Sequence, residues 1–73
     1  MFEQFKAIIL ENLSIDEELI TLDADLKKDL GINSLDLADL ILACEEKFDV
    51  EIDDTKLSSF ITVGDVVDYL SSL

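Results

Sequence analysis

The single cysteine, Cys44, limits the ways in which this chain can be stabilised. The sequence has 73 residues, one Cys and no His, so it has neither an internal disulfide nor a metal site built from Cys and His ligands. A Cys-His nucleophile pair and a Ser-His-Asp triad are excluded for the same reason. A chain of this length buries only about 60% of the surface that its unfolded form exposes. We therefore expect a very regular helical core, with Cys44 as an inert buried thiol.

The charge balance narrows the classes of partner. Eighteen Asp and Glu against five Lys and Arg give a net charge of −13, yet 49% of the residues are hydrophobic. That apolar fraction is typical of a folded domain, and that charge disfavours nucleic acid and anionic membranes as partners. No apolar run approaches the ~18 residues of a membrane span, so we expect no membrane insertion. We expect a single domain over residues 1–73, because the chain has no Pro and no repeat. We expect it in the cytoplasm, because it has no basic, apolar N-terminal leader. We also expect a monomer.

Apolar periodicity predicts four helical segments. They are residues 2–13, Ser34 to Phe48, about Asp54 to Ser59, and a last helix that Thr62 and Asp65 start as capping residues. The residues expected to face inwards are Phe2, Phe5, Ile9 and Leu13 in the first helix, Leu57 in the short one, and Val63, Val66, Val67 and Leu70 in the last.

Two connecting segments complete the expected fold. Residues 14–33 have irregularly spaced apolar side chains that indicate a loop packed on the helices, and Ser14 and Glu17 match a capping box that starts one short turn. Residues 48–52 alternate apolar and acidic over too few positions for a strand, which favours an extended connector.

We therefore predict an all-α fold. It is a small four-helix bundle of three longer helices and one short helix, with a long first connecting loop.

The helix expected over residues 34–48 has three distinct faces. At ~100° per residue, the arc that must face the core contains Leu37, Leu40, Ile41, Cys44 and Phe48. The opposite side carries Asp36, Asp39 and Glu46, and an intermediate stripe carries Leu35, Ala38 and Leu42. An exposed apolar stripe beside carboxylates favours a docking face for a basic partner. The charge run alone instead favours a solvated acidic face with incidental leucines.

Ser34 lies where this helix begins. Serine is a common N-cap residue, but Asn33 can fill that role, with Asp36 three residues on in the reciprocal position. The Ser34 hydroxyl is then uncommitted at the positive end of a helix, a position that suits a phosphate ester. Because the chain offers no general base for it, Ser34 is better suited to be another enzyme's substrate than a nucleophile.

The motif DLGINSLD at residues 29–36 resembles that of the acyl carrier proteins of fatty-acid synthesis. Further positions that carry the resemblance are Leu40, Glu45, Glu46, Phe48, Glu51, Ile52, residues 62–65, Tyr69 and Leu70. Together they cover almost the whole chain and agree with its length and acidity. The residue before the serine is usually Asp in this family and is Asn33 here, and Lys27 and Lys28 make the preceding loop more basic than usual.

The resemblance implies a carrier and no enzyme. Ser34 would receive 4′-phosphopantetheine from coenzyme A through a phosphopantetheinyl transferase (a holo-carrier synthase), and the arm's thiol would hold acyl groups as thioesters. The cargo would pass to acyl-transfer and chain-elongation enzymes with basic docking patches. The residues assigned to partner binding are Asn33, Leu35, Asp36, Ala38, Asp39, Leu42, Glu45, Glu46 and Asp54. Those assigned to an acyl-chain cavity between the helices are Leu40, Ile41, Cys44, Phe48, Leu57, Phe60 and Val66.

Three other functions compete with the carrier. An unmodified acidic adaptor would dock basic partners through the second helix and leave Ser34 unused. An acidic mimic of nucleic acid would need neither the serine loop nor exposed leucines, so the sequence disfavours it. An EF-hand starting at Asp49 fails, because its sixth position is Asp54 instead of Gly and its twelfth is Phe60 instead of Glu. We therefore expect no dedicated metal site.

Overall fold

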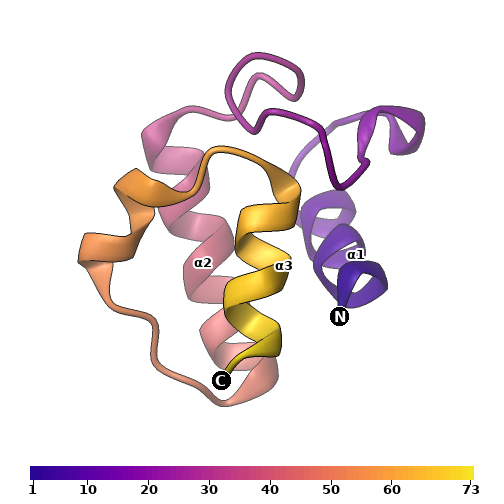
Figure 1. Cartoon of the computed structure of the whole chain (residues 1–73). Coiled ribbons are helices and arrows are strands. Elements are labelled where there is room, and N and C mark those ends of the chain that lie inside the picture. Colours follow the sequence, from indigo (N-terminus) through magenta and orange to yellow (C-terminus); the bar gives the residue numbers. More distant parts are fainter.

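The computed structural model describes residues 1–73, apart from the side chain of Asp54, and helices joined by extended loops make up the fold (Figure 1). The described part contains three α-helices, α1 (Phe2–Asn12), α2 (Ser34–Phe48) and α3 (Val63–Ser71), and two 3-10 helices, η1 (Glu17–Leu19) and η2 (Asp54–Ser59). The all-α class is confirmed. The short helix of the expected bundle is the 3-10 helix η2 rather than a fourth α-helix.

Polar side chains keep η2 in its tight 3-10 form. The Asp53 carboxylate accepts a hydrogen bond of 2.9 Å from the backbone N–H of Thr55. The hydroxyls of Ser58 and Ser59 donate to the carbonyl oxygens of Thr55 and Lys56, at 3.3 and 2.7 Å. Such bonds to the nearby backbone compete with the regular hydrogen bonds of an α-helix.

The expected start of α3 is confirmed in detail. Thr62 is its N-cap, and its hydroxyl accepts a hydrogen bond of 3.2 Å from the backbone N–H of Asp65. In return the Asp65 carboxylate accepts from the N–H groups of Thr62 and Ile61, at 3.0 and 2.9 Å. This reciprocal capping satisfies backbone donors that the first turn of a helix leaves unpaired.

The capping box expected at Ser14 and Glu17 is wrong. A short turn is present as η1, but its N-cap is Asp16, which makes no side-chain capping bond. The Glu17 carboxylate instead pairs with the ammonium group of Lys6 on α1, at 3.1 Å. The Glu17 side chain therefore extends to Lys6 of α1 instead of capping η1.

One hydrophobic cluster forms the core. Its buried members are Phe5, Ile8, Ile9, Ile20, Ala24, Leu26, Leu30, Ile32, Leu37, Leu40, Ile41, Cys44, Ile52, Phe60, Val63, Val66, Val67 and Leu70. The inward face expected for α3 is confirmed. On α1, however, Ile8 is buried whereas Phe2 and Leu13 are only partly buried. The buried face of α1 is broad in its middle because this helix packs against both α2 and α3.

The long loop between α1 and α2 is tied to the start of α3. It passes over the end of the molecule at which α2 and α3 begin, as Figure 1 shows. The backbone N–H of Leu26 donates to the carbonyl of Ile61 at 2.8 Å, and that of Val63 donates to Ala24 at 3.0 Å. Gly64 closes the same junction with a bond of 2.9 Å to the carbonyl of Leu22. The loop that precedes α2 is therefore held in place by α3, far away in sequence.

Two expected core positions are less buried than the helical spacing suggested. Phe48 is the last residue of α2, and the chain turns away at Asp49, which has a left-handed backbone with a φ of 54°. Phe48 and Leu57 are therefore only partly buried and pack against the edge of the core. The connector that follows has no strand in the described backbone, as predicted, and it buries Ile52.

Candidate functional site

Ser34 is the first residue of α2, and its hydroxyl is uncommitted as predicted. Asn33 is the N-cap, and its side-chain oxygen accepts a hydrogen bond of 2.8 Å from the backbone N–H of Asp36. The reciprocal bond, from the backbone N–H of Asn33 to the Asp36 carboxylate, is not formed among the described residues, so α2 starts with the Asn33 cap alone. Ser34 is exposed, and within the described part of the chain its hydroxyl has no hydrogen-bond partner.

Gly31 and Ile32 direct the chain into α2. Gly31 has a φ of +67°, which other L residues rarely adopt, and its N–H donates to the carbonyl of Lys27 at 3.1 Å. Ile32 is buried, and its N–H donates to the carbonyl of Leu26 at 2.9 Å. The turn therefore presents Ser34 outwards from an anchored base.

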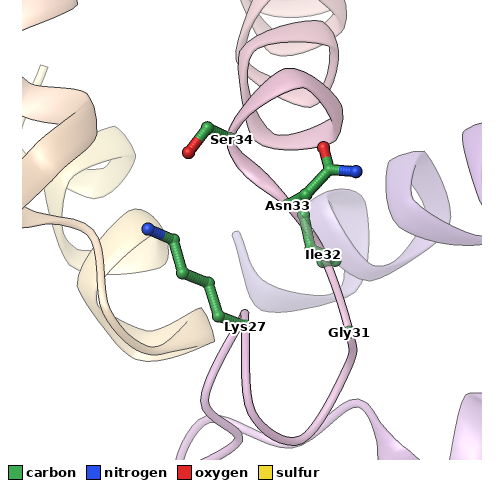
Figure 2. A pocket seen from close by; sticks show the side chains of 5 residues that line it. All are labelled: Lys27, Gly31, Ile32, Asn33 and Ser34. Carbon is green, nitrogen blue, oxygen red and sulfur yellow. The ribbon is translucent and has the colours of Figure 1, made fainter.

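Ser34 lies between two surface hollows. One has a volume of about 330 Å³ and is lined by Lys27, Gly31, Ile32, Asn33 and Ser34. The other has a volume of about 280 Å³ and is lined by Lys27, Ser34, Leu37, Leu57 and Ser58. Figure 2 shows the first hollow, with the ammonium nitrogen of Lys27 and the hydroxyl oxygen of Ser34 facing each other.

The charges around Ser34 suit a phosphate group. Although the chain has a net charge of −13, no carboxylate lines either hollow among the side chains that the structure describes. The formal charge in both linings is the cation of Lys27, whereas Asp36 in the first turn of α2 lies outside them. The unpaired N–H groups at the start of α2 add partial positive charge. The hydroxyl, the open space and the positive surroundings therefore fit an ester-linked phosphate at Ser34.

The outer side of α2 exposes the intermediate stripe expected from the sequence. The side chains of Leu35 and Leu42 are 78% and 55% exposed, and Ala38 is exposed between them. Asp39 and Glu46 are also exposed. A large apolar area thus adjoins carboxylates on a single helix.

The other residues assigned to partner binding have varied positions. Asn33 is exposed, but its side chain is engaged in capping, and Asp36 is only partly exposed. Glu45 is also partly exposed, and its carboxylate accepts a hydrogen bond of 2.9 Å from the N–H of Ile52. The side chain of Asp54 lies outside the described residues.

The residues assigned to the acyl chain lie mostly in the packed core. Leu40, Ile41, Cys44, Phe60 and Val66 are buried. Leu57 borders the hollow beside Ser34, and Leu57 and Phe60 together border an adjacent hollow of about 150 Å³. Leu57 and Phe60 therefore lie between the surface beside Ser34 and the core.

The Cys44 thiol is buried and uncharged. Burial, assisted by the nearby carboxylate of Glu45, raises the pKa of this thiol to about 11. Since the thiolate is the reactive form, Cys44 is unreactive near neutral pH. Among the described residues, no group of three or more His, Cys, Asp or Glu side chains is arranged to hold a metal ion.

Three residues that line the second hollow were not singled out as site residues from the sequence: Lys27, Leu37 and Ser58. Lys27 was visible as a basic exception in an acidic chain, but its position opposite Ser34 depends on how the loop folds. Leu37 was expected only in the core. Nothing in the spacing of Ser58 indicates that it approaches α2.

Comparisons with known proteins agree with this site. The family model described as a phosphopantetheine attachment site matches residues 3–70. The acyl carrier protein of Helicobacter acinonychis (strain Sheeba) is 47% identical over 70 residues, covering 96% of this chain and 90% of the relative. That of Campylobacter lari (strain RM2100) is 40% identical over 73 residues, covering 100% and 95%. That of Helicobacter pylori (strain 26695) is 49% identical over 70 residues, covering 96% and 90%.

No helix in the described part of the chain is both long enough and apolar enough to cross a membrane. The described site offers the exposed hydroxyl of Ser34 beside an apolar and acidic helix surface. The chain therefore belongs to the acyl carrier protein family, whose members are carriers rather than enzymes and bear a covalently attached phosphopantetheine group.

Proposed function

We propose that Ser34 is the attachment residue and that residues 1–73 act as a single carrier domain for acyl groups. The observation that carries this proposal is the exposed Ser34 hydroxyl, left without a partner because Asn33 caps α2. Ser58 shares a hollow with Ser34, but its hydroxyl donates to the carbonyl of Thr55. Ser34 thus combines access, space and a positive environment.

Attachment requires a separate transferase. The Ser34 oxygen forms a new bond to the phosphorus of coenzyme A that carries the pantetheine, the pyrophosphate bond breaks, and adenosine bisphosphate leaves. Among the described side chains no His and no carboxylate lines the hollows at Ser34, so the base that takes the hydroxyl proton is assigned to the transferase. When bound, the arm supplies a terminal thiol that can hold an acyl group as a thioester.

The surface of α2 is the proposed docking face. Its occupants are the phosphopantetheinyl transferase and the enzymes of fatty-acid or related lipid and polyketide synthesis, through basic patches. The exposed Leu35 and Leu42 supply contact area, while Asp39 and Glu46 attract the basic partner over longer distances. These roles suit a monomer in the cytoplasm that meets several enzymes in turn.

The acyl chain is proposed to enter beside Leu57 and Phe60. Both border the hollows near Ser34, and both lie next to the core that contains Leu40, Cys44 and Val66. Burying apolar cargo contributes roughly 25 cal/mol per Å² of area removed from water. In this proposal η2 acts as the short fourth helix of the bundle and covers this entrance.

The mass of the intact protein tests the attachment. After incubation with coenzyme A and a phosphopantetheinyl transferase, the wild-type protein should gain the mass of one arm. Ser34→Ala should gain nothing and remain folded, because Asn33 still caps α2. Ser58→Ala is the matched control, since Ser58 borders the same hollow, and it should be loaded normally.

The alternative of an unmodified adaptor predicts a different result. An adaptor needs only the acidic and apolar surface of α2, so its mass would stay constant with several active transferases. Loading at a residue other than Ser34 would refute the assignment of Ser34 and leave the carrier role in place.

A further inference from the structure

Lys27 is the basic residue that shares surface hollows with the proposed attachment point. It lines both hollows that contain Ser34, and its side chain extends from the loop towards that residue (Figure 2). Lys28, its neighbour in sequence, lines neither of them and borders only the hollow at Leu57 and Phe60. The two lysines carry the same charge but differ in their position relative to Ser34.

The backbone of Lys27 is held firmly. The Asp25 carboxylate accepts hydrogen bonds from the N–H groups of Lys27 and Lys28, at 2.9 and 2.8 Å. The bond to Lys28 is the main reason why the pKa of Asp25 lies below its ordinary value of 3.8. On the other side, the carbonyl of Lys27 accepts from the N–H of Gly31. The loop therefore keeps the base of the Lys27 side chain at a set position beside the start of α2.

The Lys27 ammonium group is available for an anion. Among the described side chains, the ion pair present joins Lys6 to Glu17, and Lys27 takes part in none. Lys28, Lys47 and Lys56 are likewise outside that ion pair, so what distinguishes Lys27 is its position in the linings that contain Ser34. The phosphate of an arm on Ser34 would introduce a negative charge into the space that Lys27 borders.

We propose that Lys27 binds the phosphate of the arm, holding its charge beside the Ser34 oxygen. This inference rests on the proposed attachment at Ser34. The arm adds negative charge to a protein that is already strongly acidic, which increases the self-repulsion of the folded state. Pairing with Lys27 offsets that repulsion and restricts the direction in which the arm leaves the protein.

The test compares apo and loaded forms of three proteins: wild type, Lys27→Gln and Lys28→Gln. Both variants lose one charge from adjacent positions, so their apo forms should melt alike. The ³¹P NMR signal of the loaded protein should move in Lys27→Gln and stay at its wild-type position in Lys28→Gln. At low salt, loading should lower the melting temperature about 2 °C further in Lys27→Gln than in Lys28→Gln, as expected for an exposed ion pair in a domain of this size. In about 1 M salt, where the Debye length is ~3 Å, this difference should disappear.

The possible failures are distinguishable. If the mass does not rise, or rises at another residue, the attachment at Ser34 is refuted and this inference with it. If both variants are loaded at Ser34 but show the same ³¹P signal and the same loading effect on melting, the Lys27 inference alone is wrong. A difference that persists unchanged in high salt would also overturn it, because the interaction would then not be an exposed ion pair.

Discussion

The carboxylate of Glu45 accepts a hydrogen bond of 2.9 Å from the backbone N–H of Ile52. Glu45 lies in the last turn of α2, and its carbonyl also accepts from the N–H of Val50 at 3.1 Å. Both bonds join the end of the helix to the connector that buries Ile52. The next residue, Glu46, is exposed and makes no such bond among the described residues. Two neighbouring acids on the proposed docking face thus have different structural roles.

Replacing Glu45 should therefore reduce stability, whereas replacing Glu46 should not. Glu45→Ala leaves the Ile52 N–H without its partner and should lower the free energy of unfolding by about 1 to 2 kcal/mol. Glu46→Ala should change it by less than about 0.5 kcal/mol, as is usual for exposed positions. Denaturant unfolding of both variants measures this. Equal effects would mean that the bond to Ile52 does not stabilise the connector.

Docking should respond differently to charge and to apolar area. Asp39→Lys should slow association with a basic transferase about threefold to tenfold at low salt, because steering acts mainly on the association rate. Asp68→Lys, at an exposed position on α3, makes the same charge change and should have a smaller effect. Leu42→Ala should mainly speed dissociation, since it removes contact area. Stopped-flow binding checks all three, and equal slowing by both charge reversals would place the docking face elsewhere.

Acid should destabilise the fold through its capping carboxylates. The backbone N–H groups of Thr62 and Ile61 lower the pKa of Asp65, and backbone bonds lower those of Asp25 and Asp53 in the same way. A pKa below the ordinary 3.8 means that the unfolded chain binds the proton first as pH falls. This stabilisation is present above about pH 4 and is lost as the pH drops through the lower folded-state values.

The variant Asp65→Asn tests whether the Asp65 carboxylate contributes to this loss of stability in acid. The Asn side-chain oxygen still accepts from the backbone N–H groups, but the Asn side chain does not titrate. The variant's free energy of unfolding should fall less steeply than that of the wild type between about pH 4 and pH 2. A slope identical to the wild type would remove Asp65 from the groups responsible for acid unfolding.

Thiol labelling should distinguish the buried Cys44 thiol from the terminal thiol of the attached arm. Cys44 is buried with a pKa raised to about 11, so the native apo protein should react very slowly with a thiol reagent at neutral pH. After loading, one thiol should react rapidly, and Ser34→Ala treated in the same way should show none. Unfolding in denaturant should expose Cys44 and add one reactive thiol to each protein. Fast labelling of the native apo form would contradict the buried position of Cys44.

Gly64 should not tolerate a side chain. A Cβ at this position would lie 3.0 Å from the carbonyl oxygen of Leu22, which is backbone and is held by the N–H of Gly64 itself. Gly64→Ala should therefore lower the free energy of unfolding by about 1 kcal/mol, because overpacking outweighs the better helix propensity of Ala. Thermal melting measures the change. A stabilised variant would show that the loop at Leu22 can move away at little cost.

Local patterns in the sequence determined much of the fold. The bounds of α2 and the capping pair Thr62 and Asp65 follow from interactions over three or four residues, which periodicity and capping preferences describe well. The same is true of the Asn33 cap, which leaves the Ser34 hydroxyl uncommitted as the sequence predicts.

Other features depend on which segments meet in space. Spacing alone predicted the face of α1 with Phe2 and Leu13 instead of Ile8, because its breadth is set by packing against two other helices. Glu17 does not take the expected capping role because its carboxylate pairs with the ammonium group of Lys6 on α1, at 3.1 Å.

The surroundings of Ser34 were decided by the tertiary structure. The proposal that Ser34 is the attachment residue rests on the sequence motif and the helix start, both of which are local. Lys27 lies seven positions earlier, and it borders the same hollows only because the loop is bonded to Ile61 and turned by Gly31. Sequence spacing carries no information about such a contact, since it is fixed by backbone bonds between segments far apart in the chain and by burial of the loop on the core.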